Sequence, residues 1–228
     1  MDTSTDTASL ALVHEGQILA EMTWCCQQNH TTQLLPNLQH LLDQTGVSLQ
    51  SVDSITVARG PGSYNGLRIG VSTAKGLAFN LGIPVVGIST LEAEAYQHAA
   101  TGLPICPILN AGRDEIATAL YQLKDGVWHQ IATEHLTTID ALCAQITNKT
   151  VFCGEYVSTI TEYLVGQLEE KAVIVPQFAG LRRAAFLAEL GLKRLKAGDH
   201  DDPTTLQPVY MRGPSITKPK RPWQSDSG

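Results

Sequence analysis

The chain has 228 residues, which is enough for one large core or two smaller lobes. Its composition, with 43% hydrophobic and 17% charged residues, is typical of a folded globular protein and excludes a disordered chain. A formal net charge of −6 argues against independent binding to nucleic acid, which requires clustered Lys and Arg, so a role on RNA would have to pass through a partner.

The cysteine pattern and the hydropathy limit the cellular compartments that fit this chain. There are five cysteines but no C-x-x-C, so neither a zinc knuckle nor a redox pair is predicted, and reduced thiols are favoured. No apolar run approaches the roughly 18–20 residues that cross a bilayer. The N-terminus lacks the basic and apolar segments of a secretory signal. We therefore expect a cytoplasmic protein.

The N-terminal residues predict a short strand and a hairpin. Met1 to Ser4 is typical of the end of a strand whose beginning is missing, and Thr7 to Val13 and Gln17 to Trp24 are predicted strands around Gly16. A shortened central strand would leave its neighbours' backbone groups unpaired, so we expect the true start to lie upstream of Met1.

A leucine-rich helix follows, and then a strand. Thr31 to Gln44 is predicted to be an amphipathic helix, because leucines 34, 35, 38, 41 and 42 share one face and Gly46 comes after it. Ile55 to Ala58 is a short β-branched run, and Gly60-Pro61-Gly62 ends it.

The second predicted helix runs from Gly66 to Leu81. Ser63 or Asn65 can cap its N-terminus, and Gly82 stands where a left-handed cap is expected. Val85 to Ile88 then indicates a buried strand. Strand–helix–strand alternation predicts an α/β lobe with right-handed crossovers.

This helix carries a stripe of small residues, Gly66, Gly70, Ala74 and Ala78, at intervals of four. Glycine inside a helix costs about 0.5–1 kcal/mol relative to alanine, so two glycines need a physical reason. Two reasons remain open, and both can hold on different faces: close packing on the protein's own sheet, and a flat face for another chain's helix.

Residues 90 to 104 are predicted to connect two lobes, with a helix from Thr90 to Ala99 and a hinge at Thr101-Gly102 and Pro104. The expected elements of the second lobe are strand Ile105–Leu109, hairpin Glu115–Leu123 with Gly126–Ile131, a helix from Ile139, strand Val151–Cys153, helix Val157–Leu168, strand Ala172–Val175 and helix Leu181–Lys196. From Gly213 the chain is Pro-, Lys- and Ser-rich and is predicted to be disordered. Its basic residues Lys218, Lys220 and Arg221 are either solvated or contact RNA.

Three segments resemble those of a known family. The run A-R-G-P-G-S-Y-N-G-L-R-I-G-V-S-T-A-K-G-L-A (58–78), with M-D-T-S-T-D-T-A-S-L-A-L-V at the start, is similar to the TsaB (YeaZ) family over most of residues 1–212. Pro208 to Arg212 resembles that family's closing P-x-Y-x-R. The chain departs at Tyr64-Asn65, where Phe-Thr is more usual, and at Asn110 to Glu115, where relatives show D-A-R-x-x-E.

The resemblance implies a fold and a role. The fold would be α/β, with two ribonuclease-H-like lobes of the actin–Hsp70–sugar kinase (ASKHA) superfamily and mixed sheets flanked by helices. Residues 1–102 would form the N-terminal lobe with the partner-binding helices, 103–212 the second lobe, and 213–228 a disordered tail. The role would be a non-catalytic subunit that activates TsaD, which transfers threonylcarbamoyl to N6 of adenosine 37 in tRNAs reading ANN codons.

The resemblance also implies partners and surfaces. TsaD would form a heterodimer with this chain, the TsaE ATPase would join the complex, and tRNA would be reached only through it; alone, the chain would pair as a homodimer. No cofactor of its own is expected, although ATP or ADP could bind at the TsaD junction. The implied interface residues are Leu34, Leu38, Leu41, Gly66, Ile69, Gly70, Thr73, Ala74 and Leu77.

Two other functions are weighed against this one. In the superfamily an aspartate at the place of Asp2 faces a metal-bound nucleotide, so a vestigial nucleotide or anion site is implied at Asp2, Ser4, Gly62 and Ser63. A free-standing ATPase or kinase is the alternative, yet Gly60 to Gly66 is no P-loop because no Gly-Lys-Ser/Thr follows. A metallopeptidase is also considered, but no H-x-x-x-H pair occurs among the seven histidines, so no metal site and no catalytic residue are predicted.

Overall fold

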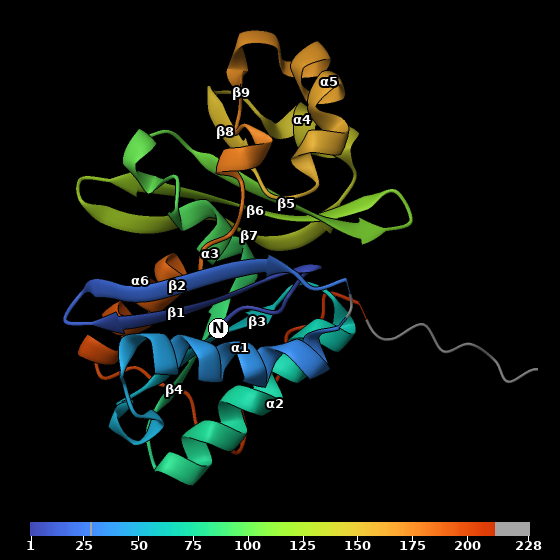
Figure 1. The fold of residues 1–228 in the computed structure, drawn as a ribbon. Helices are drawn as coiled ribbons and strands as arrows, with labels where there is room; N and C mark the ends of the chain where they lie inside the picture. Colours follow the sequence, from blue (N-terminus) through green and yellow to red (C-terminus); the bar gives the residue numbers. More distant parts are fainter. Residues whose placement is uncertain (28, 213–228) are drawn as a thin grey trace, which may run out of the picture.

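Alternating strands and helices build two α/β lobes in the computed structural model, which describes residues 1–27 and 29–212 (Figure 1). The predicted disordered tail, with Lys218 to Arg221, lies outside the described residues. Among the described residues, no helix is long and apolar enough to cross a membrane.

The first lobe is a sheet assembled from two strand pairs. Its strands are β1 (Thr7–His14), β2 (Gln17–Cys25), β3 (Ile55–Gly60) and β4 (Val85–Ser89). β1 and β2 form the predicted antiparallel hairpin, and β3 pairs with β4 in parallel. The N-terminal segment joins the two pairs, because Asp2 exchanges backbone hydrogen bonds with Ser9 of β1 while the Met1 carbonyl accepts from Ala58 of β3.

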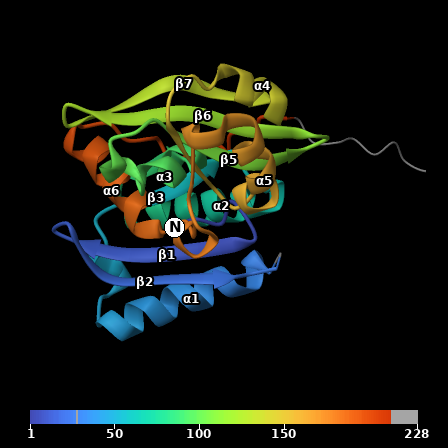
Figure 2. The same cartoon turned by 90° about the horizontal axis from the view of Figure 1, so that it is seen from above.

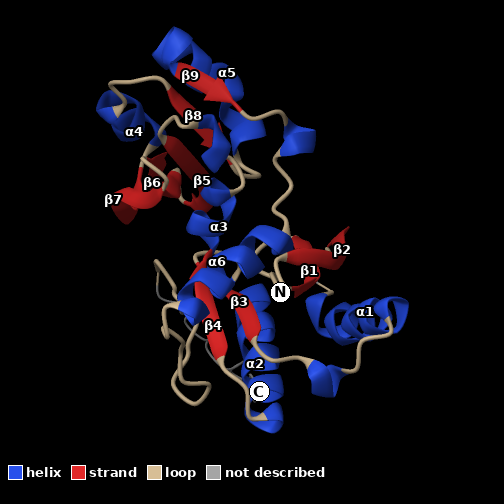
Figure 3. Ribbon diagram, turned by 90° about the vertical axis from the view of Figure 1, so that its left-hand side faces the viewer, coloured by secondary structure: helices blue, strands red, loops and turns tan. Residues whose placement is uncertain are grey.

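Two helices cover one face of this sheet, α1 (His30–Thr45) and α2 (Tyr64–Leu81). Both ends of α2 follow the predicted signals, since the Ser63 hydroxyl accepts from the Gly66 N–H and Gly82 adopts the left-handed conformation. α1 packs against the β1–β2 hairpin and α2 packs against β3 and β4, and both helices lie below the hairpin in the view of Figure 1 (see also Figure 3).

The second lobe is a five-stranded sheet in the order β7-β6-β5-β8-β9. Its strands are β5 (Ile105–Gly112), β6 (Glu115–Lys124), β7 (Val127–Thr137), β8 (Thr150–Cys153) and β9 (Ala172–Ile174). Helices α4 (Ile139–Gln145) and α5 (Val157–Leu168) pack on one face through an apolar cluster that includes Phe152 and Leu164. The other face packs on α3 (Thr90–Tyr96), which therefore lies between the two sheets (Figure 2).

The last helix belongs with the first lobe, not with the second. α6 (Ala184–Lys196) packs its Leu187 and Leu190 against β3, β4 and α3, on the face opposite α1 and α2. The chain then continues over the same lobe, where Asp201 pairs with Val85. The predicted division at 102 therefore does not describe this packing, because 184–206 returns to the sheet built by the N-terminal strands.

Two helices begin or end at other residues in the structure than the sequence predicts. The helix predicted for Thr90 to Ala99 ends at Tyr96 and is followed by a short 3-10 turn. The helix predicted from Leu181 begins at Ala184, and Arg183 before it is extended. This difference frees Arg182 from the helix and lets its side chain reach the first lobe.

Candidate functional site

The small-residue stripe of α2 is filled by the chain's own N-terminal segment. A Cβ atom at Gly66 would lie 2.0 Å from the Thr3 carbonyl oxygen, and one at Gly70 would lie 2.3 Å from the Thr3 hydroxyl oxygen. Ala74 is fully buried against the same sheet. Of the two reasons left open by the sequence, close packing on the protein's own sheet is the one that holds for this stripe.

The residues predicted to form a nucleotide or anion site lie together, but hydrogen-bond donors of Ser4 and Ser63 already donate to oxygen atoms of the protein. The Ser63 N–H donates to the Ser4 carbonyl at 2.6 Å, and a Cβ atom at Gly62 would lie 2.3 Å from that same oxygen. The N–H and hydroxyl of Ser4 both donate to the Asp2 carboxylate, at 2.8 and 2.6 Å. The glycine-rich turn thus packs on the N-terminal segment in this structure.

The Asp2 carboxylate is paired with a guanidinium that the sequence did not indicate. Arg182 Nε donates to Asp2, and Arg182 Nη1 donates to Glu94 of α3 at 3.2 Å. Its Nη2 donates to the hydroxyls of Ser4 and Thr5, both at 3.1 Å. We call these residues the Arg182 cluster, which comprises Asp2, Ser4, Thr5, Glu94, Glu155 and Arg182.

The Arg182 cluster holds more negative than positive charge. Asp2, Glu94 and Arg182 are all buried, and Glu155 lies 3.9 Å from the guanidinium. Burial would raise the pKa of Asp2, but the charge of Arg182 and the hydrogen bonds from Ser4 outweigh it, and that pKa is lowered. Burial raises the pKa of Glu94 to about 7 although Arg182 opposes the rise. One guanidinium thus neutralises three carboxylates only in part.

Two cavities lie between the elements of this region. The larger, of about 510 Å³, is lined by residues of β3, β4, α3, β6 and β7, including Arg59, Glu92 and Glu134. The smaller, of about 230 Å³, borders the Arg182 cluster through Glu155. No basic residue is among the described residues that line it. Neither cavity therefore gathers the several cations that a triphosphate would need.

The residues predicted to form the partner interface fall into two groups, buried and half-buried. Five of its residues are buried in the chain's own core and cannot meet a partner: Leu34, Leu41, Gly66, Gly70 and Ala74. For these five, the sequence-based assignment is wrong, because their side of each helix faces the sheet. Four remain half-buried at the surface of α1 and α2: Leu38, Ile69, Thr73 and Leu77.

Other residues of the same two helices are more exposed. Leu35 of α1 is 52% exposed and Phe79 of α2 is 74% exposed, and a Cβ atom at Gly76 would meet nothing within 4 Å. We call the combined surface the α1–α2 face, which comprises Leu35, Leu38, Ile69, Thr73, Gly76, Leu77 and Phe79. Of the residue types Asp, Glu, Lys and Arg, the helices contribute only Asp43 in α1, and Arg68 and Lys75 in α2.

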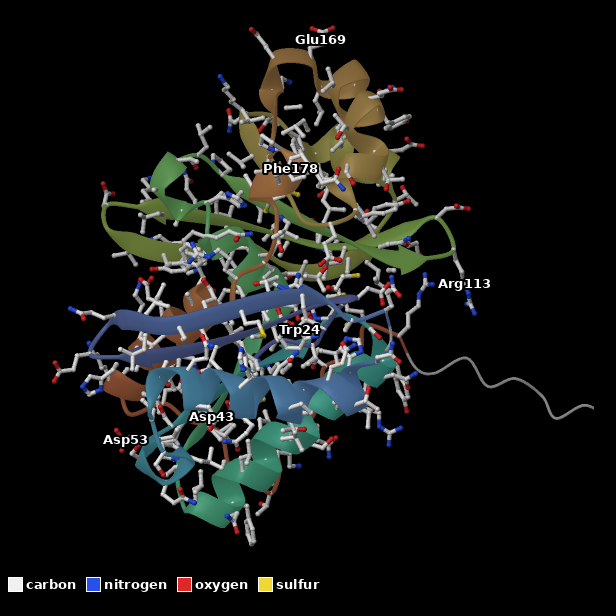
Figure 4. The ribbon with its side chains drawn as sticks, viewed as in Figure 1. Trp24, Asp43, Asp53, Arg113, Glu169 and Phe178 are labelled. Carbon is white, nitrogen blue, oxygen red and sulfur yellow. The ribbon has the colours of Figure 1, made fainter. Side chains whose placement is uncertain are left out.

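The charged residues of α1 and α2 are not part of this face as defined. Asp43 lies toward the C-terminal end of α1 (Figure 4), and the Lys75 amine is turned to the chain's own C-terminal segment, where it donates to the Leu206 carbonyl at 2.8 Å. Charge depletion with exposed apolar side chains distinguishes the core of a protein interface from ordinary surface. The arrangement can bury apolar area against another chain, and it offers no reactive group.

Comparisons with known proteins agree with the sequence resemblance. Residues 24–213 match the family model described as TsaD: tRNA N6-adenosine threonylcarbamoyltransferase. The tRNA threonylcarbamoyladenosine biosynthesis protein TsaB of Bacillus subtilis is 32% identical over 215 residues, covering 93% of this chain and 92% of the relative. TsaB of Escherichia coli is 35% identical over 139 residues, 59% of each chain. A crystal structure from Pseudomonas aeruginosa, described as similar to peptidase YEAZ, superposes with a TM-score of 0.78 at 29% identity, covering 92% of this chain and 97% of that one.

Proposed function

The chain belongs to the TsaB (YeaZ) family, and on that premise we propose that it is a non-catalytic scaffold subunit that binds and activates TsaD. Its place is in tRNA threonylcarbamoyladenosine biosynthesis, as the names of its relatives state for them. The reaction served is threonylcarbamoyl transfer to N6 of adenosine 37 in tRNAs reading ANN codons.

The observation that carries this proposal is the α1–α2 face. Gly76 lies exposed in the middle of α2, and no contact within the described residues accounts for a glycine there. Glycine weakens a helix by about 0.5–1 kcal/mol, and a close approach by another chain is the use that we propose for the open space at Gly76. Small residues let two helices pack near the lower end of about 8–10 Å, and the exposed Leu35 supplies apolar area beside them.

The Arg182 cluster supports the absence of catalysis by this subunit. Asp2 is the residue that matches the metal-facing aspartate of the superfamily, and its carboxylate is engaged by Arg182 and Ser4. Binding a metal-bound nucleotide there would require Arg182 to leave the two buried carboxylates of Asp2 and Glu94. We therefore propose that any ATP or ADP in the complex is held at the TsaD junction and not by this lobe.

The remaining parts of the proposal concern assembly. TsaE would join the TsaD heterodimer, and tRNA would be reached only through the complex, in keeping with the net charge of −6. In the absence of TsaD, the α1–α2 face would pair with its own copy about a two-fold axis, since such an axis lets one apolar patch cover itself. A stable interface of this kind buries on the order of 1,600 Å².

Reconstitution tests the proposal. TsaD is assayed for threonylcarbamoyl transfer to tRNA while this chain is added, and transfer is expected to rise and to level off at one chain per TsaD. Leu35→Glu should abolish the stimulation at equal concentrations, because it places a charge in the α1–α2 face. Phe178→Glu is the matched control, since Phe178 is 95% exposed in the other lobe (Figure 4).

Two results would contradict it. Transfer by TsaD that is unaffected by the wild-type chain removes the role of activator. Steady ATP turnover by the isolated chain that is lost in Asp2→Asn favours an enzyme of the same fold. Equal stimulation by Leu35→Glu and Phe178→Glu would leave the function intact and move the docking surface elsewhere.

A further inference from the structure

Three side chains with metal-binding atoms meet between α3 and β8. Glu94 and His98 lie one helical turn apart on and just after α3, and Cys153 is the last residue of β8. One ligand atom from each lies within 4.8 Å of the other two. Because α3 lies between the two sheets while Cys153 comes from the second, the fold alone brings them together. Residues four apart share a helix face, but the thiol is more than 50 positions away.

The imidazole is the unexplained member of this group. The Nε2 atom of His98 is shielded from solvent and has no hydrogen-bond partner among the described residues. Such a buried, unpaired nitrogen is unfavourable and calls for a partner. The Cys153 thiol is fully buried and makes one long contact, to the Glu94 carbonyl at 3.8 Å. Neither atom has a strong partner in the structure.

The surroundings orient the carboxylate and favour added positive charge. Gln97 donates to Glu94 Oε1 at 2.9 Å, and Arg182 donates to Oε2 at 3.2 Å. A carboxylate has about four lone-pair directions, so each oxygen can still bind a metal ion. The neighbouring carboxylates of Asp2 and Glu155 leave the region with three negative groups and one guanidinium. A divalent cation offsets that excess.

We propose that Glu94, His98 and Cys153 form a binding site for one Zn²⁺ ion per chain. Imidazole, thiolate and carboxylate are together the donor set of zinc rather than of Mg²⁺ or Ca²⁺. Ligand bonds of about 2.0–2.3 Å require the three side chains to close by a fraction of an ångström to about one ångström each. The thiol proton passes to solvent as the Zn–S bond forms, and a water molecule supplies the fourth ligand.

The site has a structural role and no substrate-binding role. Glu94, His98 and Cys153 line neither of the two cavities described above, so neither cavity leads a substrate to the ion. Zinc bound here ties α3 to β8 and thereby ties the core helix between the lobes to the second sheet. The site is independent of the proposed docking to TsaD, whose face lies on α1 and α2.

The full-length chain, stripped with a chelator, is titrated with Zn²⁺ by calorimetry and with Co²⁺ by absorption spectroscopy. We expect one ion per chain, a thiolate-to-cobalt charge-transfer band, and a Tm that rises by about 5–10 °C at a hundredfold excess over Kd. Cys153→Ser should remove the band and His98→Ala should weaken binding at least tenfold. Cys106→Ser is the matched control, because Cys106 is equally buried but belongs to the cluster on the opposite face of the same sheet.

The proposal is overturned if the stripped wild-type chain binds no ion, or if the bound cobalt shows no thiolate band. It is equally overturned if Cys106→Ser and Cys153→Ser change binding alike. Should Cys153→Ser fail to fold, His98→Ala decides the matter, since His98 lies half-buried beyond the end of α3. Unchanged zinc affinity in folded His98→Ala would place the ion elsewhere.

Discussion

The Arg182 cluster and the α1–α2 face differ in how their groups are satisfied. In the Arg182 cluster, charged side chains are buried and paired with one another. On the α1–α2 face, apolar side chains such as Leu35 and Phe79 stand exposed, with few charges among them. The first region uses its polar groups internally, and the second leaves apolar area that the chain itself does not cover.

The two regions therefore differ in whether their side chains serve the chain's own packing or remain exposed at its surface. The aspartate that would face a nucleotide in related folds now helps to hold the two lobes together, since Arg182 also reaches Glu94. The glycine stripe of α2 likewise serves the chain's own packing, whereas Gly76 on the same helix does not. The charged groups of the Arg182 cluster are thus enclosed by the molecule, while apolar side chains of α1 and α2 are exposed.

The largest expected effect is the loss of the buried guanidinium. Arg182→Met should lower the free energy of unfolding by about 3–5 kcal/mol, because it leaves buried carboxylates uncompensated. Urea denaturation measures this. The neighbouring Arg183→Met is the control and should cost below about 1 kcal/mol, because the Arg183–Glu21 pair is partly exposed. Equal losses in the two variants would mean that the cluster is not the stabilising feature described.

The two kinds of glycine in α2 provide the next comparison. Gly66→Ala should destabilise by about 3 kcal/mol, because its Cβ would press on the Thr3 carbonyl and the backbone must shift. Gly76→Ala should instead stabilise by about 0.5–1 kcal/mol, since its Cβ meets open space. Thermal and urea unfolding of both variants check the opposite signs. A destabilised Gly76→Ala would contradict the account of the exposed face.

The pH dependence of stability sharpens the description of the Arg182 cluster. The pKa of Asp2 lies below its ordinary value of 3.8, so its contribution is present above that value and is lost as the pH falls further. The pKa of Glu94 is raised to about 7, so its contribution is present below 4.5 and is lost as the pH rises toward 7. Unfolding free energies measured in chelator should therefore peak between these ranges.

The control for this pH profile is Glu94→Gln. It should flatten the decline toward pH 7 and leave the acid limb in place, because only the Glu94 titration is removed. A decline that persists unchanged in Glu94→Gln would assign it to another group.

The smallest effect concerns the cap of α2. Ser63→Ala should cost about 1 kcal/mol, because the Gly66 N–H loses the Ser63 hydroxyl. Asn65→Ala is the control, since Asn65 lies inside the helix and Ser63 is the N-cap residue. A similar loss in both variants, measured by urea denaturation, would show that the hydroxyl contributes no specific cap.

Local structure could be predicted from sequence where local signals decide it. Ser63 and Gly82 set the ends of α2, and the hairpin around Gly16 follows from strand alternation and a turn residue. The residue types of the stripe were also visible. The sequence did not show which side of α2 meets the sheet. The atoms that pack against Gly66 and Gly70 belong to Thr3, more than 60 positions away.

The Arg182 cluster could not be found in the same way. Arg182 lies 180 positions from Asp2 and 88 from Glu94, and no local pattern links them. The predicted helix from Leu181 would also have kept Arg182 in the second lobe. Only the return of α6 to the first sheet brings the guanidinium to the carboxylates, and that return depends on long-range packing of Leu187 and Leu190.

Affinity for TsaD tests the central claim most directly, with Gly76→Arg compared against Gly166→Arg by calorimetric titration. Both glycines lie exposed within helices and have no atom within 4 Å of a Cβ, so both variants should fold, but only Gly76 lies on the α1–α2 face. We predict at least a hundredfold weaker binding for Gly76→Arg, about 2.7 kcal/mol, and wild-type binding for Gly166→Arg. Wild-type affinity in Gly76→Arg would contradict the account.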